Sequence, residues 1–112
     1  MVSSTLVQEI TLLHADFCSA LADSTRLILL YALADGPRNV TELTQELSQP
    51  QPTISRHLKN LRDRGLVTAT RQGTMVQYTL ADHRVIDALD ILRSIMRDGI
   101  QKRASLIEET IA

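Results

Sequence analysis

Basic and amide side chains recur at helical spacing between residues 51 and 64. Arg56 and Lys59 are three residues apart, so a helix places them on one side, and Gln51 lies near its start. Arginine can donate two hydrogen bonds to a guanine edge, and glutamine can pair with adenine. Lysine and arginine also bind phosphate oxygens, which adds affinity but little sequence information. This chemistry suits a helix that reads base edges in the major groove of DNA.

The residues that we expect to contact DNA lie on this helix and on the hairpin that follows it. They are Gln51, Thr53, Ser55, Arg56, Lys59, Arg62 and Arg71. His57 differs, because at about 100° per residue it lies only about 60° from the apolar side of the helix. We expect His57 to be packed or hydrogen-bonded at the edge of the core.

Apolar spacing and helix-ending residues predict the elements around these side chains. A stripe at spacings of four and three marks one side of the helix; it consists of Ile54, Leu58 and Leu61. Gly65 suits the end of that helix. A shorter helix precedes it, with Asn39 and Glu42 as a capping box, and Pro50 separates the two.

A two-stranded hairpin is predicted after the second helix. Val76, Tyr78 and Leu80 alternate along its second strand, and residues 71–74 are expected to form its tip. A hairpin in this position is typical of a wing, which would place Arg71 against a phosphate backbone or in the minor groove.

Charge is distributed unevenly along the chain. The window from Pro50 to Gly73 holds five basic residues and one acidic residue, Asp63, a net charge of +4, whereas the whole chain has a formal net charge of −1. A local basic patch on an acidic protein indicates a binding face for nucleic acid. A merely solvated helix face would not explain this asymmetry.

The run from Phe17 to Leu80, about half of the chain, resembles the ArsR/SmtB (arsenic-repressor type) family of bacterial regulators. The matching segments are LADSTRLILLYAL at 21–33, VTEL at 40–43, QPTISRHLKNLRDRGLV at 51–67 and GTMVQYTL at 73–80. The resemblance implies a mainly α fold with a small β-hairpin (α+β), the winged helix-turn-helix, which dimerises through its first and last helices. It also implies a homodimeric transcriptional repressor that binds double-stranded DNA and is released by a small inducer or a redox signal.

Both predicted terminal helices carry broad apolar faces. The first, from about Thr5, repeats Leu6, Ile10, Leu13, Phe17 and Leu21. The last, from about Asp82 to Thr110, repeats Val85, Leu89, Leu92 and Met96. We expect them to pack across a two-fold axis, which would call for a near-palindromic operator. The alternative is that both pack on the core of their own chain.

The helix after the first is expected to begin at Asp23 and to end at Gly36-Pro37. It carries the apolar residues Leu27, Leu30, Tyr31 and Ala34, and we expect it to form part of the scaffold under the helix-turn-helix. We expect Arg26 near its start to be a structural anchor and not a DNA contact.

The resemblance also implies sensor ligands that this sequence lacks. Residues 39–43 read Asn-Val-Thr-Glu-Leu where the thiolate-binding relatives have Cys-Val-Cys-Asp-Leu, and Tyr31 replaces the cysteine of the sulfur-sensing relatives. The positions of the zinc ligands hold Asp82, Arg84, Ile95 and Asp98. We therefore expect no cofactor and no metal site. The residual metal candidates are His14 and Cys18; Cys18 could instead be a small buried hydrophobe, an oxidation sensor or a cross-link to a second copy.

Length and composition predict one domain over residues 1–112. A single cysteine and the lack of a signal peptide or of an apolar run near eighteen residues suit a cytoplasmic protein without membrane contact. There is no Ser/His/Asp set, phosphate-binding glycine loop or carboxylate cluster, so we expect no enzyme. The alternative function is a winged-helix module that binds another protein and no DNA.

Overall fold

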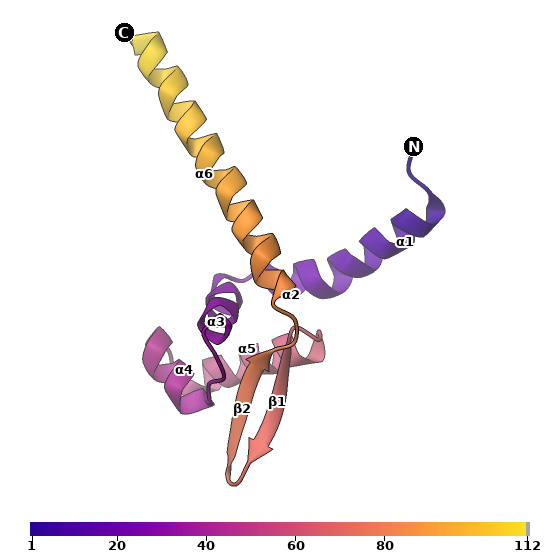
Figure 1. The fold of residues 1–112 in the computed structure, drawn as a ribbon, viewed down its shortest axis with the longest axis vertical. Coiled ribbons are helices and arrows are strands. Elements are labelled where there is room, and N and C mark those ends of the chain that lie inside the picture. Colours follow the sequence, from indigo (N-terminus) through magenta and orange to yellow (C-terminus); the bar gives the residue numbers. More distant parts are fainter. Residues whose placement is uncertain (112) are drawn as a thin grey trace. The chain divides into compact units, whose positions relative to one another are not determined.

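The structure, a computed structural model, describes residues 1–111 and divides into two compact units. The first is Met1–Asp82, and the second begins at His83. Their elements are shown in Figure 1 and are described unit by unit. No single helix in the described range is long and apolar enough to cross a membrane; one bent pair, Ser4–Leu21 with Ser24–Ala34, meets the criteria by length and composition alone.

The first unit opens with a continuous helical segment made of three parts: α1 (Ser4–Leu13), η1 (His14–Cys18) and α2 (Ser19–Leu21). Ser3 caps it, since its hydroxyl oxygen accepts a hydrogen bond from Leu6 N at 3.1 Å. The predicted helix is therefore present, but η1 is a π-helix. The sequence pattern did not predict this change of helix type, which occurs mostly as single turns inside α-helices.

The third helix, α3 (Ser24–Ala34), supplies much of the core. Asp23 caps it as predicted, with Oδ1 accepting from Arg26 N at 3.1 Å. Its buried residues are Leu29, Leu30 and Leu33. Of the four apolar residues singled out from the sequence, Leu30 is buried, whereas Leu27, Tyr31 and Ala34 are half-buried.

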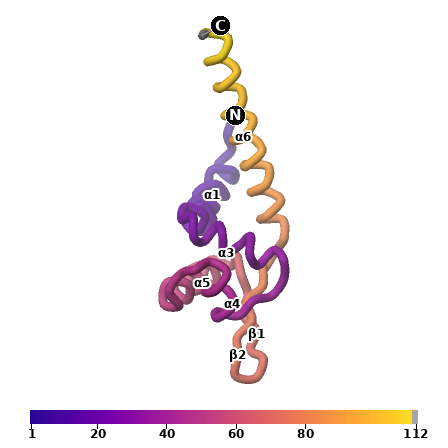
Figure 2. Tube along the Cα trace, turned by 90° about the vertical axis from the view of Figure 1, so that its left-hand side faces the viewer, coloured from indigo at the N-terminus to yellow at the C-terminus, as the bar shows by residue number. Residues whose placement is uncertain are grey.

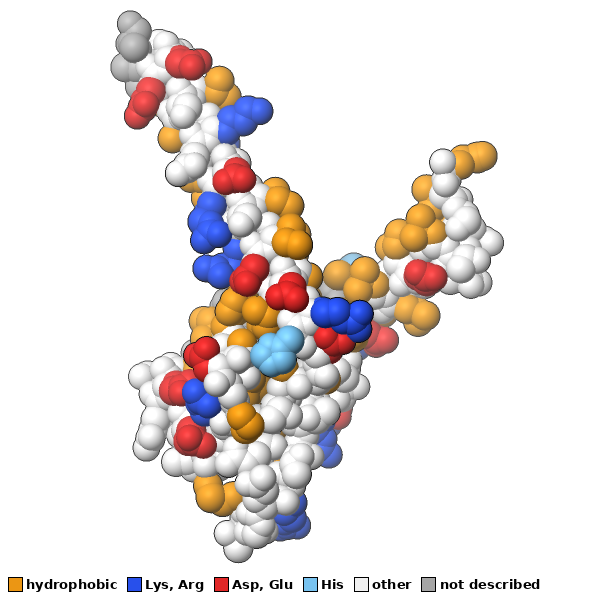
Figure 3. Space-filling view, in the orientation of Figure 1, with side chains coloured by type: hydrophobic (Ala, Val, Ile, Leu, Met, Phe, Trp, Pro, Cys, Tyr) orange, Lys and Arg blue, Asp and Glu red, His pale blue; other side chains and the backbone are white. Residues whose placement is uncertain are grey.

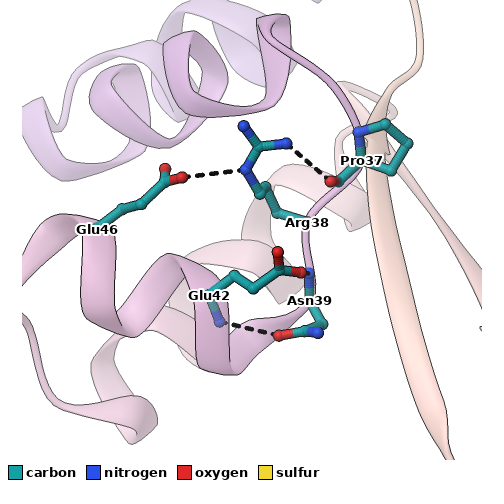
Figure 4. Close-up of polar contacts among 5 residues, drawn as sticks. All are labelled: Pro37, Arg38, Asn39, Glu42 and Glu46. Atoms are coloured by element: carbon teal, nitrogen blue, oxygen red, sulfur yellow. Dashed lines mark hydrogen bonds and ion pairs between the residues drawn. The ribbon is translucent and has the colours of Figure 1, made fainter.

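The helix-turn-helix consists of α4 (Val40–Leu47) and α5 (Gln51–Asp63). The predicted capping box is confirmed: Asn39 Oδ1 accepts from Glu42 N at 2.9 Å, and Asn39 N donates to Glu42 Oε1 at 3.0 Å (Figure 4). Ser48 ends α4 in the left-handed region at φ 52°, before Pro50.

The end of α5 is a Schellman motif, as its glycine indicated. Gly65 has φ 78°. Leu66 N donates to Leu61 O at 2.9 Å, and Gly65 N donates to Arg62 O at 3.0 Å. The chain therefore turns at once into the first strand.

The hairpin comprises β1 (Val67–Gln72) and β2 (Met75–Leu80), which pair antiparallel from Val67 opposite Leu80 to Gln72 opposite Met75 (Figures 1 and 2). Its turn is Gly73-Thr74, with Gly73 at φ 65°, so it is two residues shorter than the predicted tip. A positive φ at the first of two turn residues favours glycine there.

Arg38 joins the hairpin to the helix-turn-helix. Its backbone exchanges two hydrogen bonds with Tyr78 of β2, at 3.1 and 2.8 Å. Its side chain donates from Nε to Glu46 Oε1 of α4 at 3.0 Å and from Nη1 to Pro37 O at 2.9 Å (Figure 4). One residue thus connects β2 with α4.

The second unit is the long helix α6 (Arg84–Ile111). Its exposed large apolar side chains are Ile91, Leu92, Ile95, Met96, Ile100, Leu106 and Ile107. In the first unit, α1 and η1 carry a similar apolar set, visible in orange along α1 in Figure 3. It consists of Leu6, Val7, Ile10, Leu12, Leu13 and Phe17.

Candidate nucleic-acid interface

α5 separates its apolar and polar side chains onto opposite sides. The predicted stripe of Ile54, Leu58 and Leu61 has no exposed surface at all. Of the residues expected to meet DNA, five on this helix are exposed: Gln51, Ser55, Arg56, Lys59 and Arg62. Thr53 is half-buried, and Arg71 is exposed on β1. The buried side fixes the helix, and the outward side is free to meet a ligand.

The side chain of His57 lies on the side of α5 that faces the protein, as predicted. It is 7% exposed, and its Nδ1 lies 3.3 Å from Arg26 Nη1. Because a guanidinium group only donates hydrogen bonds, Nδ1 accepts. The proton of a neutral imidazole then lies on Nε2, which is 3.9 Å from Asp23 Oδ1.

Arg26 is the structural anchor that its position indicated. Its Nε donates to Ala20 O at 2.6 Å, and its Nη2 donates to Ser19 O at 3.2 Å. With His57, these contacts bind α5 to the start of α3 and to α2. The hydrogen bond from Arg26 N is the largest cause that lowers the pKa of Asp23 below its ordinary value; burial opposes this effect, and the charge of Arg26 adds to it.

Lys59 is exposed, and its ammonium group is held by a carboxylate one turn later. Its Nζ lies 2.9 Å from Asp63 Oδ2, with side-chain exposures of 79% and 58%. This hydrogen bond lowers the pKa of Asp63, and the charges of Lys59, Arg62 and Arg64 act in the same direction. An exposed pair of this kind contributes little to stability, so the lysine can exchange its partner for a phosphate.

The carboxyl end of α5 is tied to η1 by Arg64. Its Nη1 donates to Ala15 O at 2.9 Å and to Asp16 Oδ1 at 3.2 Å. Arg64 and Arg26 together bind α5 to the segment from Ala15 to Ala20. A helix held at both its middle and its end keeps a defined orientation.

Comparison with known proteins places this geometry in a family. Residues 23–69 match the family described as "Bacterial regulatory protein, arsR family". An uncharacterized HTH-type transcriptional regulator of Methanocaldococcus jannaschii is 39% identical over 79 residues, which are 70% of this chain and 89% of that protein. This chain belongs to the ArsR family. The protein named "Probable mercury resistance operon repressor", from Streptomyces lividans, is 35% identical over 103 residues, 88% of this chain and 82% of that protein.

A solved structure agrees with the fold. The homodimeric winged helix-turn-helix DNA-binding domain from Mycobacterium bovis, solved by NMR in solution, superposes with a TM-score of 0.73 and 28% identity, over 88% of this chain and 90% of that chain. The family resemblance and the winged helix-turn-helix fold predicted from the sequence are therefore confirmed.

The two residual metal candidates of this ArsR protein lie at the ends of η1. His14 and Cys18 are both exposed, and Cys18 is a free thiol, so the interpretation of Cys18 as a buried hydrophobe does not hold within a single chain. Among residues 1–111, no group of three or more His, Cys, Asp or Glu side chains is arranged to hold a metal ion. The structure thus offers these two residues no third ligand in the described part of the chain.

The bond from Arg64 to η1 was missed by the sequence reasoning, which placed this arginine only in the basic window. Its partners lie 49 and 48 residues away. No local sequence pattern predicts a contact between residues so far apart in the chain. The one available signal was position: Arg64 directly precedes Gly65, where a helix ends and its side chains can reach neighbouring elements.

Proposed function

We propose that this protein is a homodimeric, sequence-specific DNA-binding transcriptional repressor, which inserts α5 into the major groove and uses the β1–β2 hairpin as a wing. One observation carries the proposal: the apolar side of α5 is entirely buried, while Gln51, Ser55, Arg56, Lys59 and Arg62 are exposed on the same helix. A helix fixed in this way, and basic on its free side, has the properties of a recognition helix.

The residues divide into two roles by their chemistry. Gln51, Ser55 and Arg56 are suited to base edges, because amide, hydroxyl and guanidinium groups match the donors and acceptors of the major groove. The remaining proposed contacts, which supply phosphate binding and register, are Thr53, Lys59, Arg62 and Arg71.

Homodimerisation is part of the proposal because α1 and α6 each expose apolar surface that water disfavours. The homodimer from Mycobacterium bovis supports it by analogy. Two copies related by a two-fold axis would present their α5 helices about one turn of DNA apart, roughly 34 Å, to a near-palindromic operator. We propose that residues 1–112 work as one DNA-binding domain, that a small inducer or redox signal releases the operator, and that the protein acts in the cytoplasm.

Fluorescence anisotropy with the promoter fragment of an adjacent gene and with random duplex tests the proposal. Arg56→Ala is expected to cost about 1–3 kcal/mol on the operator and to relax base preference, whereas Arg103→Ala on α6 is the matched control. Lys59→Ala is expected to weaken both duplexes alike and to reduce the slope of log K against log salt by about 0.9, with Lys102→Ala as control.

The result that would refute the function is equal binding of operator and random duplex by the wild-type protein. Loss of binding in Arg103→Ala and Lys102→Ala, with none in the α5 variants, would refute the role of α5. A protein that binds no DNA, with no response to ionic strength, would instead fit the protein-interaction module.

A further inference from the structure

The π-helix η1 changes the hydrogen bonding of one backbone carbonyl. In an α-helix, Ser19 N would donate a hydrogen bond to Ala15 O, four residues earlier. In this chain Ser19 N donates instead to His14 O, five residues earlier, and to Asp16 O. Ala15 O therefore loses the donor that an α-helix would give it, and it is available to a donor from outside the helix.

Arg64, from the carboxyl end of α5, supplies that donor. Its Nη1 donates to Ala15 O at 2.9 Å and lies 3.2 Å from Asp16 Oδ1. A charged donor makes a stronger hydrogen bond than a neutral one. The contact therefore favours the π form of η1 over an α-helical form, in which Ala15 O would already be bonded to Ser19 N.

The two ends of η1 differ in how firmly they are held. On the carboxyl side, Arg26 donates to Ser19 O at 3.2 Å and to Ala20 O at 2.6 Å, and Ala20 has no exposed surface. On the amino side, no residue of α1 is buried within the described part of the chain. A change in the helix type of η1 would therefore leave α2 in place and move α1.

The helix type of η1 also sets the direction of the apolar face of α1. A π-turn, closed by an i→i+5 bond, holds one residue more than an α-helical turn, and one residue corresponds to about 100° of rotation. If η1 became α-helical with the same number of residues, the face formed by Leu6, Ile10 and Leu13 would turn by about 100°. These side chains are 42%, 50% and 50% exposed in the single chain, and they belong to the surface proposed to pair with a second copy.

We propose that Arg64 is a positioning residue, which holds η1 in the π form and thereby couples α5 to the dimer surface on α1. In the homodimer, the rotation of α1 determines how far apart the two α5 helices lie, so Arg64 sets the half-site spacing that the protein prefers. The inference rests on the proposed homodimeric DNA-binding function.

Half-site spacing is a property that a merely stabilising contact would leave unchanged. On an operator mapped by footprinting, the half-sites are moved one base pair closer or farther apart, a shift of about 3.4 Å, and affinity is measured by fluorescence anisotropy. For the wild type we expect each shift to weaken binding about tenfold, because the two α5 helices can no longer bind together. For Arg64→Ala we expect the preference for the original spacing to fall to about threefold or less.

Asp16→Asn is the matched control for the ion pair. It removes the carboxylate that Arg64 contacts but keeps the backbone oxygen of Ala15, which is the acceptor that the inference requires. We expect this variant to retain the wild-type preference for half-site spacing. A loss equal to that of Arg64→Ala would assign the effect to the ion pair and would overturn the role of Ala15 O.

Deletion of Ala15 separates the helix type from the anchoring contact. Removing one residue from the π-turn leaves a continuous α-helix whose two flanks keep their present relation, because the residue in excess of an α-helical turn is gone. We expect the deletion variant to keep the wild-type spacing preference, and Arg64→Ala to have no effect on spacing in that background. If the contact only anchored α5, the deletion would cost at least as much of that preference as Arg64→Ala.

NMR spectroscopy without DNA tests the helix type independently of the proposed function. The scalar coupling across the hydrogen bond should connect Ser19 N with the carbonyl carbon of His14 in the wild type. In Arg64→Ala it should connect Ser19 N with the carbonyl carbon of Ala15. If the deletion variant does not fold, this coupling and the spacing profile of Arg64→Ala decide.

The inference is overturned if Arg64→Ala keeps the coupling to His14 and the wild-type spacing preference. It is also overturned if a folded deletion variant loses that preference. When the wild type still prefers operator over random duplex, either result refutes this inference alone. Equal binding of operator and random duplex by the wild type refutes the proposed function, and the role of Arg64 in half-site spacing fails with it.

Discussion

Arg64 Nη1 lies 2.9 Å from the backbone oxygen of Ala15, a contact that joins the end of α5 to the π-helix η1. We expect Arg64→Ala to lower the free energy of unfolding by about 1 kcal/mol, since it removes this hydrogen bond and the contact with Asp16. Urea denaturation measures the change. Arg97→Ala, an exposed arginine on α6, is the control and should change stability by less than half as much; equal losses would show that Arg64 does not anchor α5.

Asp23 should make the stability of the protein sensitive to acid. Its pKa is lowered in the folded state, chiefly by the hydrogen bond from Arg26 N. A lowered folded pKa means that the contribution is fully present above the unfolded pKa of about 3.9 and is lost as pH falls through the folded pKa.

We therefore expect wild-type melting temperatures to fall more steeply below about pH 4 than those of Asp23→Asn, which keeps a capping oxygen but does not titrate. At pH 7, Asp23→Ala is expected to cost about 1 kcal/mol through loss of the cap. Parallel acid profiles for wild type and Asp23→Asn would contradict this assignment.

Substitutions at Gly65 and Gly99 together test the effect of backbone conformation on stability. A Cβ added to Gly65 or to Gly99 meets no atom within 4 Å, but only Gly65 has a positive φ, of 78°. We expect Gly65→Ala to destabilise by about 1–2 kcal/mol because alanine resists the left-handed region. Gly99→Ala, inside α6, should stabilise by about 0.5–1 kcal/mol because alanine favours a helix. Thermal melts of both variants measure these changes; a stable Gly65→Ala would show that the Schellman turn is dispensable.

A charged substitution at Leu13 tests the proposed dimer without disturbing the core of the chain. The residue is 50% exposed in the single chain, so a charge there is tolerated by the monomer. We expect Leu13→Glu to give a monomer in light scattering and to lose at least tenfold in operator affinity, because two α5 helices would no longer bind together. Gln8→Glu, with the same charge change on the opposite side of α1, should remain dimeric. A dimeric Leu13→Glu would remove α1 from the interface.

The helix-turn-helix could be predicted closely because its signals are local. Asn39 with Glu42, Pro50 and Gly65 each dictate a cap or a turn through their own chemistry, and each lies where the structure ends or begins a helix. The burial of His57 could be predicted from its angular position beside the apolar stripe of α5. Local chemistry also indicated the hairpin, although a two-residue turn replaced the expected four-residue tip.

What the sequence could not predict depends on contacts between distant elements. In α3 every position from Leu27 to Ala34 is apolar, so periodicity could not choose between Leu27 and Leu29 for the core. The π-helix η1 and its bond to Arg64 join segments almost fifty residues apart. The shallow groove beside α5 is likewise lined in part by Arg26 from another helix, and no spacing within α5 reveals it.

The side chains that hold α5 and those that it presents outward form two separate sets. Leu58, His57 and Arg64 face the protein, whereas Gln51, Ser55 and Arg56 do not contribute to its core. A gene duplicate could therefore acquire a new promoter by changing only the second set, at little risk of misfolding. Simultaneous randomisation of those three codons should yield a library in which most members are still produced in native form, which makes this scaffold a convenient starting point for orthogonal genetic switches.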